Sequence, residues 1–370
     1  MGMRTQHRTI GSGLPMGWPR FFVGPRRMMA APRPDPYPMI RDLFGDATIR
    51  FLASHTPAPV ATYRLETPVP RVARTPPATV RANGLRIEYD TFGDPAHPPL
   101  LLVMGLAGQM VAWDEEFCAR LAARGLWVIR FDNRDIGRST WLNDEPVPNV
   151  VALLRAQRRG LPVRVPYRVP DMADDALGLL DALGVRSAHV VGVSMGGMIA
   201  QTMAIQAPER VRTLTSIMSH TGEPDLPHPH WRASASLFIP APRTPQTALR
   251  RAVDVWRVLN GPRMPVDLAR TRAQAELALS RGRNPAGTAR QLAAILATPS
   301  RAAGLRALRV PTLVIHGEED PLVPLEGGLR TAAHVPGAEL EVIPRMGHAL
   351  APPLWERIID RIVRHAARGG

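Results

Sequence analysis

A serine, an aspartate and a histidine in the second half of the chain have the residue types and the order that acyl transfer requires. Ser194 lies between Gly192 and Gly196 in "GVSMG", which matches the pattern G-x-S-x-G. A serine hydroxyl is a weak nucleophile at neutral pH, so it needs a base and an acid that orients the base. Asp320 in "LVIHGEEDPLVP" and His348 in "LEVIPRMGHALAPP" follow in that order. We therefore predict that Ser194 is a nucleophile, His348 its base and Asp320 the orienting acid.

The sequence around Ser194 predicts the local structure that such a nucleophile needs. The apolar run "AHVVGV" before the serine indicates a buried strand, and "MGGMIAQTMAIQAP" after it indicates a helix. The flanking glycines allow a sharp turn that lifts the serine Oγ above the sheet, next to the first N–H groups of the helix. The pentapeptide alone is a weak signal, since a plain glycine-rich turn gives the same letters.

Other acids and histidines compete for the two supporting roles. Glu318 and Glu319 directly precede Asp320. Asp320 is favoured because a proline follows it, which keeps its backbone extended. Of the eleven histidines, His348 alone follows a glycine in a loop after the last predicted strand, whereas His316 ends a buried strand and is predicted to be a core residue.

The oxyanion of an acyl-transfer intermediate needs two N–H donors. The backbone N–H of Met195, directly after the nucleophile, is one candidate. The second is the N–H of Leu106 in "LLLVMGLAG", where Gly105 follows an early strand. The alternative for that segment is an ordinary glycine-rich turn.

The elements that position these residues begin near residue 79. "TVRANGLRIEYDTFG" predicts a hairpin that turns at Asn83-Gly84. Apolar strands then alternate with amphipathic helices, which predicts an α/β fold with a mostly parallel, doubly wound sheet. Residues of about 220–307 interrupt this alternation with helical stretches such as "QTALRRAVDVWRVLNG". We expect them to form a helical lid, inserted before the last strands of a domain that spans 79–370.

Residues 1–78 have a different composition. They contain 13 of the 39 prolines and 11 arginines against four acidic residues. Proline removes backbone donors and fixes φ, so this segment is predicted to be a flexible extension rather than a domain. Only residues 37–54 have enough apolar periodicity for a short helix.

Composition excludes several classes of function. The net charge of +14 comes from arginines alone, with no lysine, and they are scattered along the chain; this disfavours a nucleic-acid-binding stripe. The single cysteine, Cys118, excludes a thiolate-rich metal site and is predicted to be buried. His220, His228 and His230 lie in a proline-broken segment, so no metal site is expected. Neither a membrane span nor an export signal is found, so a cytoplasmic location is expected.

Several segments together resemble the α/β-hydrolase superfamily, and within it the branch similar to aclacinomycin methylesterase. They are "LLVMGLAGQMVAWDEEFCARLAARGLWVIRFDNRDIGRST", "VVGVSMGGMIAQTMA", "ARQLAAILATPSR", "VPTLVIHGEEDPLVP" and "MGHAL". The resemblance implies a carboxylic ester hydrolase that needs no cofactor. Ser194, Asp320 and His348 match the triad positions, and Leu106 and Met195 match the oxyanion donors. It further implies that "DNRDIGRST" buttresses the site, with Arg134 and Asp135 in structural ion pairs.

The predicted function is therefore hydrolysis of a small ester through an acyl-enzyme. Apolar lid side chains favour an apolar or aromatic substrate; they are Trp231, Leu237, Phe238, Trp256 and Leu259. Hydrolysis of a carbon–carbon bond or cofactor-free perhydrolysis would use the same triad. A ligand-binding receptor with a hydrolase-type pocket is the alternative from another class. The sequence indicates neither an oligomeric state nor a natural substrate.

Overall fold

The computed structural model describes residues 61–369 except 64, 66, 160, 162 and 239–243, and these belong to one compact unit, Tyr37–Gly370. The side chains of residues 157, 158, 236–238 and 245 are also outside the description. The prediction of a flexible extension therefore lies outside the described residues up to position 60, and so does the helix expected at 37–54.

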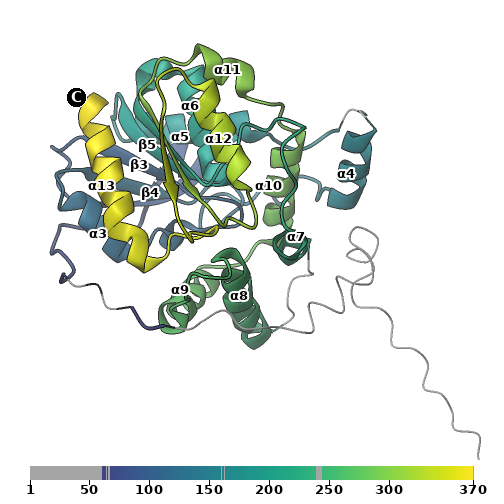
Figure 1. Ribbon diagram of the computed structural model, residues 1–370, viewed down its shortest axis with the longest axis horizontal. Coiled ribbons are helices and arrows are strands. Elements are labelled where there is room, and N and C mark those ends of the chain that lie inside the picture. Colours follow the sequence, from purple (N-terminus) through teal and green to yellow (C-terminus); the bar gives the residue numbers. More distant parts are fainter. Residues whose placement is uncertain are drawn as a thin grey trace, which may run out of the picture. The chain divides into compact units, whose positions relative to one another are not determined.

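Eight strands form one sheet in the order β1-β2-β4-β3-β5-β6-β7-β8 (Figure 1). The β1–β2 and β2–β4 pairs are antiparallel, and the other five pairs are parallel. The strands are β1 Ala78–Ala82, β2 Leu85–Phe92, β3 Pro99–Val103, β4 Trp127–Phe131, β5 Ala188–Val193, β6 Val211–Ile217, β7 Thr312–Gly317 and β8 Glu339–Ile343. Because β3 and β5 to β8 are mutually parallel, their carboxyl ends meet at one edge of the sheet, where ligands bind in such folds.

The first two strands form the predicted hairpin. Ala82 pairs with Leu85, so the loop contains only Asn83 and Gly84. Both have positive φ, 47° and 77° respectively. A two-residue turn with positive φ at both positions follows the twist of the strands, and asparagine and glycine adopt that conformation most readily.

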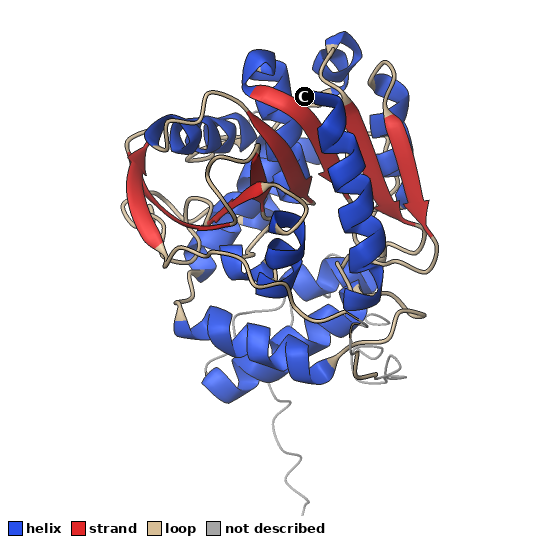
Figure 2. Cartoon of the chain, turned by 90° about the vertical axis from the view of Figure 1, so that its left-hand side faces the viewer, coloured by secondary structure: helices blue, strands red, loops and turns tan. Residues whose placement is uncertain are grey.

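Helices cover both faces of the sheet, as continuous apolar strands require. In β3, Leu100 and Leu102 pack in the cluster that contains α3 and α13, whereas Leu101 and Val103 pack in the cluster that contains α5 and α6. Figures 1 and 2 show these layers. The helices around the sheet are α3 Glu115–Ala122, α5 Val169–Ala182, α6 Met195–Gln206, α12 Leu325–His334 and α13 Trp355–Ala366, with short 3-10 turns η1 Met110–Ala112, η2 Pro208–Arg210, η3 Pro352–Leu354 and η4 Ala367–Gly369. The helix α4 Val150–Arg158 lies apart from the sheet, at one side of the body (Figure 1).

The predicted insertion lies between β6 and β7. Its helices are α7 Trp231–Phe238, α8 Pro245–Leu259, α9 Leu268–Ser280, α10 Pro285–Ala297 and α11 Ala302–Ala307. In Figure 1, α8 and α9 lie below the sheet body, while α10 stands between the body and α4. The predicted fold class, a mostly parallel doubly wound sheet with a helical lid before the last strands, is confirmed. The helix α4 was not predicted.

The expected extension, 1–78, contacts the domain within its described residues, which are 61–78 except 64 and 66. The N–H of Ala61 donates to the carbonyl of Val266, and the hydroxyl of Tyr63 donates to the carbonyl of Pro265. Farther along, Arg120 of α3 donates to the carbonyl of Thr67 at 2.7 Å. This segment therefore runs from the lid to the sheet body along the domain surface.

Candidate active site

Ser194 lies in a strained turn between β5 and α6. Its φ is 57° and its ψ is −121°, a backbone conformation that residues with a side chain rarely adopt. The neighbouring glycines make this turn possible. A Cβ on Gly192 would lie 2.1 Å from the carbonyl oxygen of Gly196, and a Cβ on Gly196 would lie 2.1 Å from that of Val103. The structure thus gives the predicted elbow, with both glycines required by close backbone packing.

His348 and Asp320 meet at the carboxyl edge of the sheet. Nδ1 of His348 lies 2.7 Å from Oδ2 of Asp320. Since the carboxylate can only accept, Nδ1 carries the proton and Nε2 is left as the basic nitrogen. The other oxygen, Oδ1, accepts the N–H groups of Leu322 and Val323 at 2.9 and 2.8 Å. Both side chains are buried, so the pair is held in one orientation.

The competing glutamates point elsewhere. Glu318 accepts the backbone N–H of Arg345 at 3.4 Å, and Glu319 forms an ion pair with Arg263. Of the three consecutive acids, it is Asp320 that the structure pairs with His348.

The lid contributes to the position of His348. The backbone N–H of His348 donates to the carbonyl of Leu259, the last residue of α8, at 2.6 Å. A Cβ on Gly347 would lie 2.5 Å from that carbonyl oxygen and equally close to the backbone of Asn260. Sequence reasoning did not find this contact, which joins segments almost ninety residues apart.

The loop after β3 approaches the serine as predicted. A Cβ on Gly105 would lie 3.1 Å from the Cβ of Ser194 and 3.6 Å from its Oγ. Leu106, next in the chain, is half-buried. Met195 is the first residue of α6, and a first helical N–H has no acceptor within its own helix. The two predicted oxyanion donors therefore come from segments that flank Ser194.

Gln291 of α10 holds the loop that carries the predicted oxyanion donor Leu106, and it was not predicted from the sequence. Its Oε1 accepts the N–H of Ala107 at 3.0 Å, and its Nε2 donates to the carbonyl of Arg134 at 2.8 Å. Gln291 is fully buried. Ala107 has a φ of 59°, so this bond stabilises a strained peptide directly after Leu106. The only signal in the sequence was its place in "ARQLAAILATPSR", one of the segments that carry the family resemblance.

The segment after β4 forms the predicted buttress. Arg134 pairs with Asp175 at 2.6 Å, and Asp135 pairs with Arg290 of α10 at 2.7 Å. Burial acts to raise the pKa of Asp135, but hydrogen bonds from Arg290, a backbone N–H and Tyr167 together hold it below its usual value. Asp135 therefore stays ionised, and its ion pair fixes the lid against the body.

The remaining candidates behave as structural groups. Nε2 of His316 lies 2.8 Å from the carbonyl of Val323, and burial lowers the pKa of this imidazole. Cys118 is buried, and burial raises the pKa of its thiol to about 12. Within the described residues, no three His, Cys, Asp or Glu side chains are grouped for a metal ion. No helix in the same ranges is both long and apolar enough to cross a membrane.

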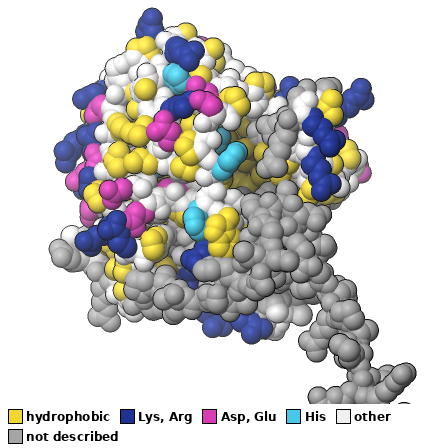
Figure 3. All heavy atoms as spheres, turned by 45° about the vertical axis from the view of Figure 1, so that its right-hand side comes forward, with side chains coloured by type: hydrophobic (Ala, Val, Ile, Leu, Met, Phe, Trp, Pro, Cys, Tyr) yellow, Lys and Arg dark blue, Asp and Glu magenta, His cyan; other side chains and the backbone are white. Residues whose placement is uncertain are grey.

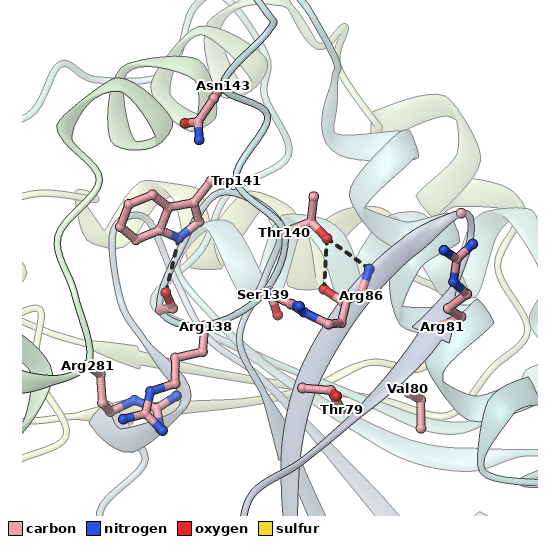
Figure 4. A pocket seen from close by; sticks show the side chains of 12 residues that line it. Thr79, Val80, Arg81, Arg86, Arg138, Ser139, Thr140, Trp141, Asn143 and Arg281 are labelled. Carbon is pink, nitrogen blue, oxygen red and sulfur yellow. Dashed lines mark hydrogen bonds between the residues drawn. The ribbon is translucent and has the colours of Figure 1, made fainter.

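Two hollows lie near the predicted lid and the β1–β2 hairpin. Figure 3 shows hydrophobic side chains and a histidine around a depression between the body and an arginine-bearing lobe. A second hollow, of about 910 Å³, lies between the β1–β2 hairpin and the loop after β4 (Figure 4). Its lining includes Arg81, Arg86, Arg138 and Trp141 but neither Ser194 nor His348, so it is separate from the triad.

Comparison with known proteins agrees with this geometry. Residues 98–351 match the family model described as the alpha/beta hydrolase fold. The chain belongs to the α/β-hydrolase family. The matched residues extend from β3 to the loop after His348 and include all three members of the proposed triad.

Two curated relatives of this α/β-hydrolase are rhodomycin D methylesterases. DauP from Streptomyces sp. (strain C5) and DnrP from Streptomyces peucetius are each 35% identical to it, over 297 and 298 residues; each alignment covers 74% of this chain and 92% of the relative. They confirm the predicted resemblance to the aclacinomycin methylesterase-like branch.

Other relatives of this α/β-hydrolase are named for different activities. A 2-hydroxymuconate semialdehyde hydrolase from Pseudomonas putida is 34% identical over 49% of this chain and 63% of its own length. Among solved structures, the 2-hydroxy-6-oxo-6-phenylhexa-2,4-dienoate hydrolase of a Rhodococcus strain has a TM-score of 0.61 at 22% identity, covering 80% of this chain and 99% of that one. This structural likeness shows the fold.

Proposed function

We propose that this α/β-hydrolase cleaves a carboxylic ester with Ser194 as nucleophile, His348 as base and Asp320 as orienting acid. The observation that carries the proposal is the 2.7 Å contact of His348 with Asp320, at the edge of the parallel sheet where β5 ends at Ser194, a serine with a positive φ between β5 and α6. The kinship with two methylesterases supports ester hydrolysis as the activity of the enzyme.

The reaction would proceed in two acyl-transfer steps. Nε2 of His348 takes the proton of the Ser194 hydroxyl as its oxygen attacks the ester carbonyl. The N–H groups of Leu106 and Met195 stabilise the resulting oxyanion. The imidazolium, stabilised by Asp320, then protonates the departing alcohol. Water attacks the acyl-enzyme by the same route and releases the carboxylic acid.

The substrate we propose is a methyl ester with an apolar or aromatic body. The methyl group is proposed because both relatives are methylesterases. The apolar body follows the lid, where Trp231 and Leu259 are half-buried and Trp256 is 37% exposed; the side chains of Leu237 and Phe238 are outside the described residues. A cytoplasmic location, and a mechanism without a cofactor or nucleic-acid partner, remain predictions from the sequence.

Carbon–carbon bond hydrolysis is the second candidate. It is favoured by the 34% identity to the semialdehyde hydrolase of Pseudomonas putida, but that alignment covers less of both chains than the methylesterase alignments do. The same triad would serve both reactions, so only the substrates that the enzyme turns over can distinguish them.

The test is hydrolysis of short p-nitrophenyl esters and aromatic methyl esters by wild type and Ser194→Ala. We expect the substitution to abolish turnover and to prevent labelling by a fluorophosphonate. Ser280→Ala, at an exposed serine that ends α9, is the matched control and should behave as wild type. Equal rates for wild type and Ser194→Ala would refute the serine mechanism. Turnover of a vinylogous 1,5-diketone without any ester hydrolysis would establish the carbon–carbon reaction instead.

A further inference from the structure

His220 lies at the carboxyl end of β6, between the strands that carry the triad. In the sheet, β6 pairs with β5, which leads to Ser194, and with β7, which leads to Asp320. The end of β6 is bonded directly to the elbow: the N–H of Ser194 donates to the carbonyl of Ile217 at 2.9 Å, and the hydroxyl of Ser219 donates to the carbonyl of Ser194 at 2.8 Å. His220 follows at once.

The backbone around His220 is fixed from the lid side. Arg301, before α11, donates its backbone N–H to the carbonyl of Thr221 and its Nη2 to the carbonyl of His220, at 2.8 and 2.7 Å. Gly327 of α12 also approaches this residue, since a Cβ on Gly327 would lie 2.8 Å from the Cβ of His220. These contacts fix the backbone and the Cβ of His220.

The protonation of this imidazole follows from its contacts. Nδ1 accepts the N–H of Gly222 at 2.9 Å, so Nδ1 is unprotonated and Nε2 carries the hydrogen. Burial, followed by the positive charge of Arg301, lowers the pKa of His220 to about 4. The ring is thus a neutral hydrogen-bond donor at physiological pH.

The donor nitrogen has no partner in the described part of the chain. The hydrogen bond of this imidazole is made at Nδ1, and no described residue bonds Nε2. Nε2 is not fully buried, so it remains accessible to solvent or to a ligand. The end of β6 is bonded to the Ser194 elbow, and Asp320, the partner of the proposed base, follows the neighbouring strand β7, so His220 lies at the same edge of the sheet as the proposed triad. A neutral donor held at that edge is suited to recognise an acceptor on the substrate.

We propose that His220 is a specificity-determining residue whose Nε2–H donates a hydrogen bond to a second oxygen of the substrate, a keto or hydroxyl group near the ester. The inference rests on the proposed function, since it assumes an ester bound over Ser194. It narrows the substrate class from esters in general to esters with an additional oxygen acceptor close to the scissile carbonyl.

The test compares methyl pentanoate with three methyl oxopentanoates, which carry the keto oxygen on the second, third or fourth carbon. The readout is the ratio of kcat/KM for each oxo ester to that for methyl pentanoate. We expect His220→Phe to lower this ratio about tenfold for at least one oxo ester, the worth of a single hydrogen bond to a neutral acceptor. His220→Gln, which keeps an N–H donor, should retain most of the ratio. His228→Phe, at an exposed histidine of the same segment, should leave it unchanged.

The outcomes separate the two proposals. General damage by His220→Phe would lower all four rates together and leave the ratios unchanged, which would overturn the role of His220 while ester hydrolysis stands. An equal fall of the kcat/KM ratio in His220→Phe and His220→Gln would show that the preference for oxo esters does not depend on a hydrogen bond donated by residue 220, which would overturn the proposal. If Ser194→Ala still hydrolyses these esters, the proposed function itself falls, and the role of His220 falls with it.

Discussion

Replacing Gly347 by alanine should misplace His348, the proposed base, without unfolding the protein. The new Cβ would lie 2.5 Å from the carbonyl oxygen of Leu259 and from the carbonyl carbon of Asn260. Both are backbone atoms at the end of α8, so neither can rotate away as a side chain could. Either the His348 loop or the end of α8 must move.

The size of the effect follows from that contact. Ordinary carbon–oxygen contacts begin near 3.4 Å, so the loop must shift by about 1 Å. A displacement of about 1 Å in a catalytic group lowers the rate about a hundredfold, equivalent to about 2.7 kcal/mol of activation free energy. The shift also lengthens the 2.6 Å hydrogen bond from the His348 N–H to Leu259. Crowding at such a site destabilises the fold by about 1–3 kcal/mol.

The assay is the kcat of ester hydrolysis, together with thermal unfolding of the same variant. Gly337→Ala is the matched control, because Gly337 also resists substitution, having a φ of +72°, but has no atom within 4 Å of the new Cβ. We expect Gly337→Ala to lose about 1 kcal/mol of stability through backbone strain and no activity. A Gly347→Ala enzyme with wild-type kcat would refute the argument that the α8 contact positions His348.

Three further results are expected. Asp320→Asn should lower kcat by about 10⁴ with little change in KM, because an amide NH₂ favours the wrong tautomer of His348; a loss below tenfold would contradict the assigned acid. Gln291→Leu removes the acceptor of the Ala107 N–H and should lower the kcat of ester hydrolysis about tenfold to a hundredfold. The dissociation constant of a ground-state inhibitor, measured on the same variant, should stay unchanged. Burial lowers the pKa of His189 to about 4, so the unfolded chain binds its proton near pH 6.5 and the folded one does not. The contribution of neutral His189 to the free energy of unfolding should therefore be fully present above pH 6.5 and be lost as the pH falls toward 4. In His189→Gln the melting temperature should fall less steeply over this pH range. The same slope in wild type and variant would contradict this role of His189.

The part of the site predicted from the sequence is the part that rests on local patterns. The elbow at Ser194 could be predicted because a buried strand, two glycines and a helix are contiguous in the chain. Asp320 and His348 could be predicted because the order of strands fixes which loops share an edge of a parallel sheet. Their pairing at 2.7 Å agrees with that order.

The rest depends on contacts that no local pattern encodes. Gln291 reaches Ala107 across 184 positions, and a glutamine within a helical stretch has no distinguishing feature in the sequence. His220 was considered only as a metal ligand, since its orientation depends on Arg301 and Gly327, which are distant in the chain. The helix α4 was missed because prolines flank residues 150–158 and none of its seven described side chains, at 150–156, is buried, so its apolar periodicity is weak.

These distant contacts make the lid a fixed part of the catalytic frame. Arg281, at the end of α9, forms a buried ion pair with Glu88 of β2 at 2.6 Å and a second with Asp132. Arg290 of α10 is paired with Asp135 in the same way. Moving α9 and α10 away from the body would separate these charged pairs and also break the hydrogen bonds of Gln291 to Ala107 and Arg134. The same helix α10 thus holds the loop of the proposed oxyanion donor Leu106, and the end of α8 holds the loop of the proposed base. Because the lid supports both loops of the proposed site, we expect substrate to enter between these contacts, past side chains that can rotate, rather than by a movement of α9 and α10.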